Sequence, residues 1–278
     1  MFQNVPKELD WKIYIEVAQT YDRMAEYEKA ICHLGNSIQS CPDNIKWKIW
    51  LIAARIQFRL GEYERSREII ERCCYEVPSK QMSMAMLEYA KHFEMRSQPH
   101  RARQIMQHTK RIAKAEWKTH FEAVLLEIRA GCFDVAEDLV HQSLTVHFAT
   151  GRLWATLIQL QHARAQTEQE FDQAFRTFNQ ALREIPKSGE VWCEGARISM
   201  ADNVNNRNCK FAEAENYLNF AIQFTPQYGD SFLEMLKLYI LTGQNDKIAA
   251  LKQQCIHAEP NYGVLWFFYK ESYLDNAM

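Results

Sequence analysis

The sequence predicts an all-α protein, a right-handed solenoid built from pairs of helices. A junction with proline, glycine and an aromatic residue at fixed offsets occurs three times, at 186–192, 226–232 and 260–266. The copies begin 40 and 34 residues apart, a period typical of stacked helical repeats. Proline cannot continue a helix and glycine permits a chain reversal. The aromatic residue returns to apolar packing, so each junction predicts the end of one pair and the start of the next.

The first helix of each predicted pair begins with an aromatic block. Residues 11–18, 47–54 and 117–124 each start with Trp-Lys and continue with apolar residues at helical spacing. A degenerate copy fills 82–94. Further first helices are expected near Trp154, Trp192, Phe232 and Trp266. Their periodic tryptophans are interpreted as core residues rather than as base-stacking residues.

The second helix of each pair carries an aromatic residue followed three positions later by a small one. The two share a helix face, so the ring can fill a gap while the small side chain admits close helix approach. The pattern occurs at Tyr27/Ala30, Tyr63/Ser66, Phe133/Ala136, Phe171/Ala174 and Phe211/Ala214.

The domain organisation follows from this count. Residues 1–278 are expected to form a single helical-repeat array, with about seven pairs over 7–260 and an unpaired helix over 261–274. Loops inside the pairs are expected to be short, except for two polar ones at 164–170 and 201–210.

Composition excludes several classes of protein. The formal charge of −2 rules out a globally basic nucleic-acid binder, so any such contact needs a local patch. The eight cysteines form no C-x-x-C pair, which favours structural thiols in a reducing compartment. The first residues show no signal peptide, and no stretch is apolar enough to cross a membrane.

No motif indicates catalysis. The sequence has no glycine-rich phosphate loop, no H-E-x-x-H, no G-x-S-x-G and no paired-cysteine metal motif, and its nine histidines are dispersed. We therefore expect no enzymatic activity, no metal site and no cofactor.

One charged segment, 96–118, is a candidate contact site for an anionic partner. It holds seven arginines and lysines against a single acid, Glu116. Its helical spacing predicts that Arg103, Lys110 and Lys114 share one face. If the segment binds a partner, the partner is expected to be a nucleic-acid phosphate backbone or an acidic protein. The alternative is that the segment is a solvated outer face without a partner. The candidate patch comprises Arg103, Lys110, Arg111, Lys114 and Lys118.

The helix after Pro260 is a candidate docking end. Residues 264–268 are all apolar, so they present apolar surface around the whole helix. At least one of Phe267 and Phe268 is expected to point away from the preceding pair, because they lie about 100° apart. Trp266, Phe267 and Phe268 are therefore expected to dock on a second copy, a partner protein or further repeats.

The repeat pattern resembles the half-a-TPR (HAT) repeats of RNA-processing proteins. Ordinary TPRs place a small residue four positions after the first tryptophan. This chain has Ile15, Leu51, Phe121 and Ile158 there, with Ala196 as an exception. The junctions at 185–192 and 255–266 are similar to the C-terminal repeats of the family of pre-mRNA splicing factors that bridge the tri-snRNP.

This resemblance implies a non-catalytic scaffold that holds proteins of a ribonucleoprotein assembly. It implies nuclear localisation, with cytoplasmic localisation as the alternative. Two alternatives remain at this point. One is direct binding of single-stranded RNA by the repeat surface, and the other is a TPR-type peptide adaptor unrelated to RNA. Self-association through the C-terminal helix is a further expectation.

Overall fold

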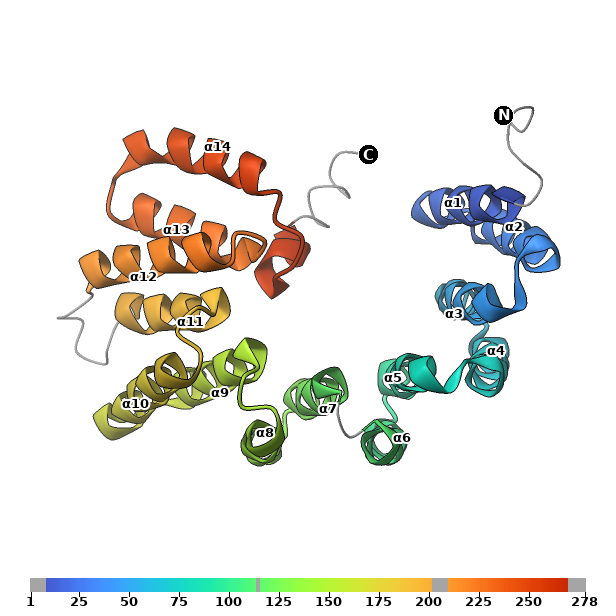
Figure 1. Cartoon of the computed structure of the whole chain (residues 1–278), viewed down its shortest axis with the longest axis horizontal. Coiled ribbons are helices and arrows are strands. Elements are labelled where there is room, and N and C mark those ends of the chain that lie inside the picture. Colours follow the sequence, from blue (N-terminus) through green and yellow to red (C-terminus); the bar gives the residue numbers. More distant parts are fainter. Residues whose placement is uncertain (1–8, 114–115, 202–209, 270–278) are drawn as a thin grey trace. The chain divides into compact units, whose positions relative to one another are not determined.

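The structure, a computed structural model, confirms the all-α class and the repeated helix pairs (Figure 1). It describes residues 9–113, 116–201 and 210–269. Within these ranges there is no strand, only an isolated bridge between Tyr228 and Tyr262. The chain divides into two compact units, residues 1–130 and 131–278. Whether they join into the single expected array stays a prediction.

The first unit contains seven α-helices and a short 3₁₀ helix within its described residues. Helix α1 packs on α2, α3 on α4 and α5 on α6, and each of these second helices also packs on the first helix that follows it. The helices are α1 (Asp10–Arg23), α2 (Tyr27–Ser40), α3 (Asp43–Arg59), α4 (Tyr63–Glu76), η2 (Ser79–Gln81), α5 (Met82–Met95), α6 (Pro99–Ile112) and α7 (Trp117–Arg129).

The second unit repeats the same scheme. Residues 264–269 are helical as well, and the remainder of the helix expected over 261–274 lies outside the described residues. The helices are α8 (Phe133–Val146), α9 (Gly151–Arg164), α10 (Glu168–Glu184), α11 (Gly189–Met200), α12 (Phe211–Phe224), α13 (Gly229–Leu241), η3 (Asn245–Lys247) and α14 (Ile248–Ala258).

The small residue of the aromatic-x-x-small pattern is buried where each second helix packs against its neighbours. Ala30, Ser66, Ala136, Ala174 and Ala214 are all at most 1% exposed. A methyl or hydroxymethyl group there lets the backbones approach, while the aromatic residue three positions earlier stays nearer the surface. The sequence pattern therefore correctly located the packed face of these helices.

Turns within the pairs use the left-handed conformation. Gly61, Gly131 and Gly243 have φ of 84°, 74° and 70°, directly after a first helix. Ala25 and Ser97 occupy the equivalent turn with φ of 57° and 56°, although they carry a Cβ.

The two polar loops that were expected to be long have different outcomes. The loop after α9 is shorter than expected, because a capping box between Thr167 and Glu170 starts α10 early. Most of the other loop, 202–209, lies outside the described residues.

Two of the three junction glycines have a different role from the one expected, whereas Gly263 has a φ of 143°. Gly189 and Gly229 are not in the positive-φ region, so they are not needed for a reversal. A Cβ built on Gly189 would lie 2.6 Å from Thr225 Cβ, and one on Gly229 would lie 2.3 Å from the Trp266 ring. A side chain has no room at either position, because the second helix of the same pair packs against the backbone at Gly189 and the next repeat packs against it at Gly229.

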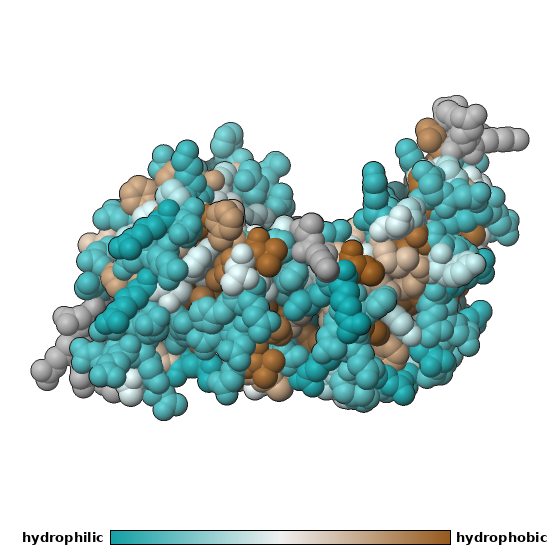
Figure 2. All heavy atoms as spheres, turned by 60° about the horizontal axis from the view of Figure 1, so that its bottom comes forward, coloured by the Kyte–Doolittle hydropathy of each residue, from teal (hydrophilic) through white to brown (hydrophobic). Residues whose placement is uncertain are grey.

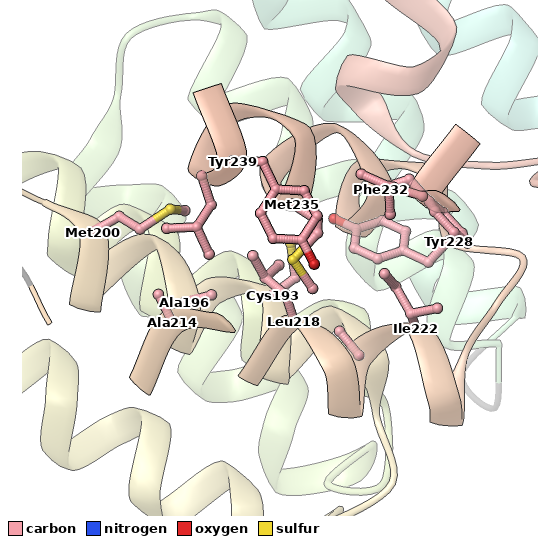
Figure 3. Close-up of a cluster of buried hydrophobic side chains, with 13 residues drawn as sticks. Cys193, Ala196, Met200, Ala214, Leu218, Ile222, Tyr228, Phe232, Met235 and Tyr239 are labelled. Atoms are coloured by element: carbon pink, nitrogen blue, oxygen red, sulfur yellow. The ribbon is translucent and has the colours of Figure 1, made fainter. Parts of the chain in front are cut away.

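The largest core cluster of the second unit joins α11, α12, α13 and α14 (Figure 3). Leu218, Phe232 and Met235 belong to this cluster and are at most 3% exposed. Not every repeated tryptophan is buried to this extent. Trp47 and Trp154 are buried, whereas Trp192 is half-buried between Phe178 and the rings of α12.

Candidate interaction surface

Two arginines of the basic segment form ion pairs with carboxylates of the protein itself. Arg103 forms a two-pronged ion pair with Glu127, both N–H···O distances being 2.7 Å, and the Glu127 side chain is only 6% exposed. Arg96 pairs with Glu64 at 2.8 Å. The segment itself holds only Glu116, but carboxylates from α7 and α4 lie beside it.

The candidate residues of the segment do not all share one face. Arg103 and Lys110 lie within about 20° of each other around α6. Lys110 is half-buried, and burial lowers the pKa of its amine. Lys114 follows the end of α6 at Ile112 and lies outside the described residues. Arg111 and Lys118 are exposed, on α6 and α7 respectively.

A groove opens beside this segment, between the start of α5 and the end of α6. We call it the α6 groove, and its volume is about 780 Å³. Met82, Ile112 and Ala113 give it apolar walls, and Ile112 is 50% exposed. The residues that line it are Ser79, Lys80, Met82, Ser83, His108, Ile112, Ala113 and Glu116.

The acid in the groove is held by a buried hydroxyl. The hydroxyl of Ser83, which is 3% exposed, donates a hydrogen bond of 2.5 Å to Glu116 Oε2. This bond joins the first turn of α5 to the residue that precedes α7. The groove is therefore formed by α5, α6, the residue before α7 and the short helix η2.

The predicted docking end, residues 264–269, divides into a packed side and an exposed side. Trp266 is half-buried, and its indole lies against the backbone of Gly229. Phe267 is 46% exposed and Phe268 65% exposed. The geometry agrees with the expectation that at least one of the two phenylalanines faces outward.

Asp230 fixes the start of this helix. Its carboxylate, 1% exposed, accepts hydrogen bonds from the amides of Val264 and Trp266 at 3.2 and 2.9 Å. A carboxylate at this position satisfies amides that a helix N-terminus otherwise leaves unpaired. The start of the helix is thus held by a residue of the preceding repeat.

A buried ionic cluster lies between α11 and α13. Arg197 Nε donates to Glu234 Oε1 at 2.8 Å, Arg197 also pairs with Glu194, and its Nη2 lies 3.6 Å from Asp230 Oδ2. One cation therefore faces three carboxylates, each at most 4% exposed. Burial raises the pKa of Glu194 to about 7. The cluster is closed to a substrate, so it is a structural link between repeats.

Ion pairs about one repeat apart recur throughout both units. Arg55 pairs with Glu88 at 2.7 Å, Lys247 with Glu215 at 2.6 Å, and Arg129 with Glu94. Each pair joins helices of neighbouring repeats. Each of these cations therefore has a carboxylate partner within the protein.

Sequence reasoning missed the α6 groove and the buried cluster. Met82 and Ser83 are about 30 residues from Ile112 and Glu116, and no motif connects the two segments. Glu194 and Glu234 stand five residues after the glycines of two successive junctions. That equivalence was available as a signal, but two glutamates on amphipathic helices are ordinarily solvated.

One face of the surface is shown in Figure 2, where hydrophilic residues predominate and apolar side chains form separate patches. Among the residues that the structure describes, no helix is long and apolar enough to span a membrane. The same residues contain no group of three or more histidine, cysteine or acidic side chains placed to hold a metal ion.

The paired helices, the small-residue contacts and the inter-repeat ion pairs define a helical-repeat protein of the tetratricopeptide class. Solved structures agree on the fold. Yeast Tom70 is 13% identical, with a TM-score of 0.64 over 99% of this chain and 55% of that one. A tetratricopeptide repeat protein from Parabacteroides merdae is 14% identical, with a TM-score of 0.50 over 84% of this chain and 85% of that one.

The family follows from the sequence match. The family model of the PRP6 TPR-like domain matches residues 1–278, so the chain belongs to this family. A TPR-containing protein of Dictyostelium discoideum is 45% identical over 166 residues, which are 59% of this chain. The match covers only 12% of the length of that relative. The resemblance to splicing-factor repeats is thereby confirmed at the level of the family.

Proposed function

We propose that this protein is a non-catalytic scaffold that holds protein partners within a ribonucleoprotein assembly of pre-mRNA splicing, in the nucleus. The observation that carries the proposal is the match of the PRP6 family model to all 278 residues. Stacked helix pairs support it physically, because they give a long surface to which several partners can bind.

The neutralised arginines favour protein partners over nucleic acid. Arg103, Arg129 and Arg197 are bound to carboxylates of the protein itself, so a phosphate would have to compete with those carboxylates for them. The formal charge of −2 gives no general attraction to RNA. Contacts of a scaffold of this composition are expected to rest on apolar side chains with local charge.

Capture from nuclear extract tests this function. The tagged chain is immobilised, and bound proteins and small nuclear RNAs are identified by mass spectrometry and sequencing. We expect splicing ribonucleoprotein components to be enriched over a tagged Trp47→Ala variant whose first unit is destabilised. Enrichment of proteins unrelated to splicing alone would refute the splicing role and favour a general peptide adaptor.

Direct RNA binding is a second candidate, favoured by the exposed cations Arg111 and Lys118. Phosphate contacts give an affinity that falls steeply with salt. A gel shift with single-stranded U20 RNA between about 50 and 200 mM salt measures this dependence. Binding that is strong and steeply salt-dependent in the absence of any protein partner would favour this candidate over the protein scaffold.

The C-terminal end is proposed as a further contact of the scaffold, through Phe267 and Phe268. A second copy is one occupant that this end could take. Light scattering behind a sizing column, at tens of micromolar protein, tests that occupant. A monomeric chain under these conditions excludes a tight homodimer.

A further inference from the structure

Helices α10 and α12 expose side chains that the packing of the repeat does not require. Phe220 and Phe224 of α12 stand nine and thirteen residues after the aromatic residue of the second-helix pattern, and they are 41% and 37% exposed. At these places the other four helices with the pattern have no ring, but Asn36/Ser40, Arg72/Glu76, Gln142/Val146 and Gln180/Glu184. Arg176 and Arg183 of α10 stand five and twelve residues after the same aromatic residue, and the other four helices have no arginine or lysine at either place. These four residues are therefore features of one part of the chain and not of the repeat.

The rings form a continuous row at the surface. The Trp192 and Phe220 ring centres are 4.9 Å apart, and Phe220 is stacked on Phe224 with 6.1 Å between centres and an interplanar angle of 13°. The indole N–H of Trp192 donates to the carbonyl of Pro186 at 2.8 Å. Because this donor is satisfied, the ring offers a ligand its aromatic face and no polar group. Such a row is a platform on which flat groups can stack.

The two arginines line a surface pocket of about 640 Å³ on α10. No acid belongs to its lining, which consists of Arg176, Asn179, Gln180, Leu182 and Arg183. Neither guanidinium makes a hydrogen bond or an ion pair with a residue that the structure describes. Asp172 and Glu184 lie outside the lining, and with Lys187 the stretch 172–187 holds three cations against two acids. The pocket therefore favours an anionic ligand.

The row of rings and the arginine pocket adjoin each other at Leu182. Trp192 lies beside the end of α10, because its ring centre is 5.9 Å from that of Phe178 and its indole is bonded to Pro186. Leu182 stands between these two residues, within about 40° of Phe178 around α10. From Leu182 the pocket continues around the helix to the two arginines. We call the surface formed by Arg176, Arg183, Trp192, Phe220 and Phe224 the α10–α12 face.

We propose that the α10–α12 face binds a single strand of RNA. The phosphates of the strand pair with the two arginines, and its bases stack on the three rings, a combination by which proteins hold single strands without reading their sequence. An acidic peptide is disfavoured, because its carboxylates would use the arginines and leave the rings without a partner. The proposal deepens the second candidate function and rests on it, at residues other than Arg111 and Lys118.

Fluorescence polarisation with labelled single-stranded U20 RNA tests this face on the full chain. Arg176→Gln/Arg183→Gln removes the two charges and keeps groups that can form hydrogen bonds. Phe220→Leu/Phe224→Leu removes two aromatic faces and keeps apolar side chains. We expect the parent to bind U20 and each double variant to bind it at least about fivefold more weakly.

The salt dependence separates the two contributions. The arginine variant is expected to lower the slope of log K against log salt by about 1.4, which is about 0.7 for each lost phosphate contact. The phenylalanine variant is expected to leave the slope unchanged, because it removes no charge.

Matched controls separate the face from general effects of charge and of exposed rings. Arg65→Gln/Lys252→Gln removes two exposed cations elsewhere, and Phe133→Leu/Phe148→Leu replaces two exposed rings elsewhere. Both are expected to change the affinity less than about twofold. A U20·A20 duplex, whose bases are already stacked on one another, is expected to bind more weakly than U20. Circular dichroism melts confirm that all variants fold.

Four results would overturn the proposal. One is that the parent fails to bind U20 at tens of micromolar protein in about 50 mM salt. Another is that the arginine or the phenylalanine variant binds U20 as tightly as its matched control. A third is that the duplex binds more tightly than U20. The last is that polyglutamate displaces U20 at lower concentration than unlabelled U20 does, which would favour an acidic protein.

The test is separable from the functions proposed above. If Arg111→Gln/Lys118→Gln loses U20 binding and Arg176→Gln/Arg183→Gln keeps it, the chain binds RNA and the assignment to the α10–α12 face falls. If the parent does not bind U20 but still captures splicing components from extract, the protein scaffold stands and the RNA site falls. If the variants of the face lose U20 and still capture proteins from extract treated with ribonuclease, both the scaffold and the RNA site stand.

Discussion

The hydroxyl of Tyr262 donates a hydrogen bond of 2.9 Å to Glu190 Oε1, across 72 residues of the chain. The guanidinium of Arg152 lies 4.5 Å from the centre of the same ring. One tyrosine at the last junction therefore contacts the first turns of α9 and α11. Its carbonyl also accepts the amide of Gly229 at 2.8 Å, which adds α13.

We predict that Tyr262→Phe lowers the free energy of unfolding by about 1 kcal/mol. The change removes a hydrogen bond to a carboxylate but leaves the ring on Arg152. Urea denaturation measures the difference. Tyr75, which is 92% exposed, provides the control, because Tyr75→Phe removes only a solvated hydroxyl. Equal stability of the two variants would show that the bond contributes nothing.

We predict that a glycine-to-alanine substitution has opposite effects on stability at Gly189 and at Gly35. Gly189→Ala places a methyl group 2.7 Å from the carbonyl oxygen of Ala221, so we expect a loss of about 1–3 kcal/mol. Gly35 lies inside α2 with nothing within 4 Å of a Cβ, so Gly35→Ala is expected to stabilise by about 0.5–1 kcal/mol. Thermal melts followed by circular dichroism compare both with the parent. The same sign for the two would contradict the close-approach explanation.

The buried cluster predicts a pH dependence. The pKa of Glu194 is about 7 in the folded state, whereas the ordinary pKa of a glutamate is 4.5. The folded state thus holds this proton more tightly than the unfolded chain does, and the stability falls as pH rises from about 4.5 through 7.

Glu194→Gln abolishes that titration and keeps an oxygen that can accept from Arg197. We expect the variant to gain about 1–3 kcal/mol relative to the parent on going from about pH 5 to pH 8, measured by urea denaturation at both values. The exposed Glu68→Gln is the control and is expected to show no such difference. A relative stability of Glu194→Gln that is independent of pH would mean that Glu194 is ionised throughout this range.

We predict a large loss of stability when Trp47 of α3 is replaced by alanine. Trp47 is 4% exposed and packs with Leu51, Cys73 and Val77, so Trp47→Ala is expected to cost about 3–5 kcal/mol. Trp192→Ala is expected to cost less than Trp47→Ala, because its ring is only half-buried. Thermal melts compare the two, and a melt of Trp47→Ala within one or two degrees of the parent would contradict the core assignment.

We predict that substitutions at Trp266 and Phe268, on the packed and exposed sides of the docking end, differ in their effect on stability. Phe268→Glu changes a side chain that is 65% exposed and is expected to alter stability by less than about 0.5 kcal/mol. Trp266→Ala opens the space against Gly229 and is expected to cost about 2–4 kcal/mol. The two are compared by urea denaturation. If Phe268→Glu is the more destabilising, the assignment of packed and exposed sides is wrong.

The fold could be predicted because its pattern repeats. Two features recur along the chain: the aromatic block that begins with Trp11, Trp47 or Trp117, and the small residue of the second helices. Because each occurs several times, a weak local signal is averaged over the copies. The aromatic residue of the second-helix pattern is the first residue of the helix at Tyr27 and Tyr63, a regularity of the repeat that the pattern alone did not predict.

The candidate site was harder to predict, because its determinants are contacts between repeats. Arg103 is neutralised by Glu127, 24 residues away, and no motif in either segment indicates the pair. The α6 groove depends on how far η2 lies from the end of α6, which is a matter of backbone geometry. The sequence identified the basic segment but could not tell which of its charges are free.

The carboxylate of Asp230 belongs to the repeat that precedes the helix it caps. The helix that begins at Val264 therefore takes the acceptor for two of its first amides from α13. A ribosome synthesises the chain from its N-terminus, so Asp230 leaves the ribosome before the amides that it serves. The acceptor is then already in place when the later segment becomes free to coil. Assembly of this end is thus expected to proceed in one direction, each finished turn acting as the template for the next.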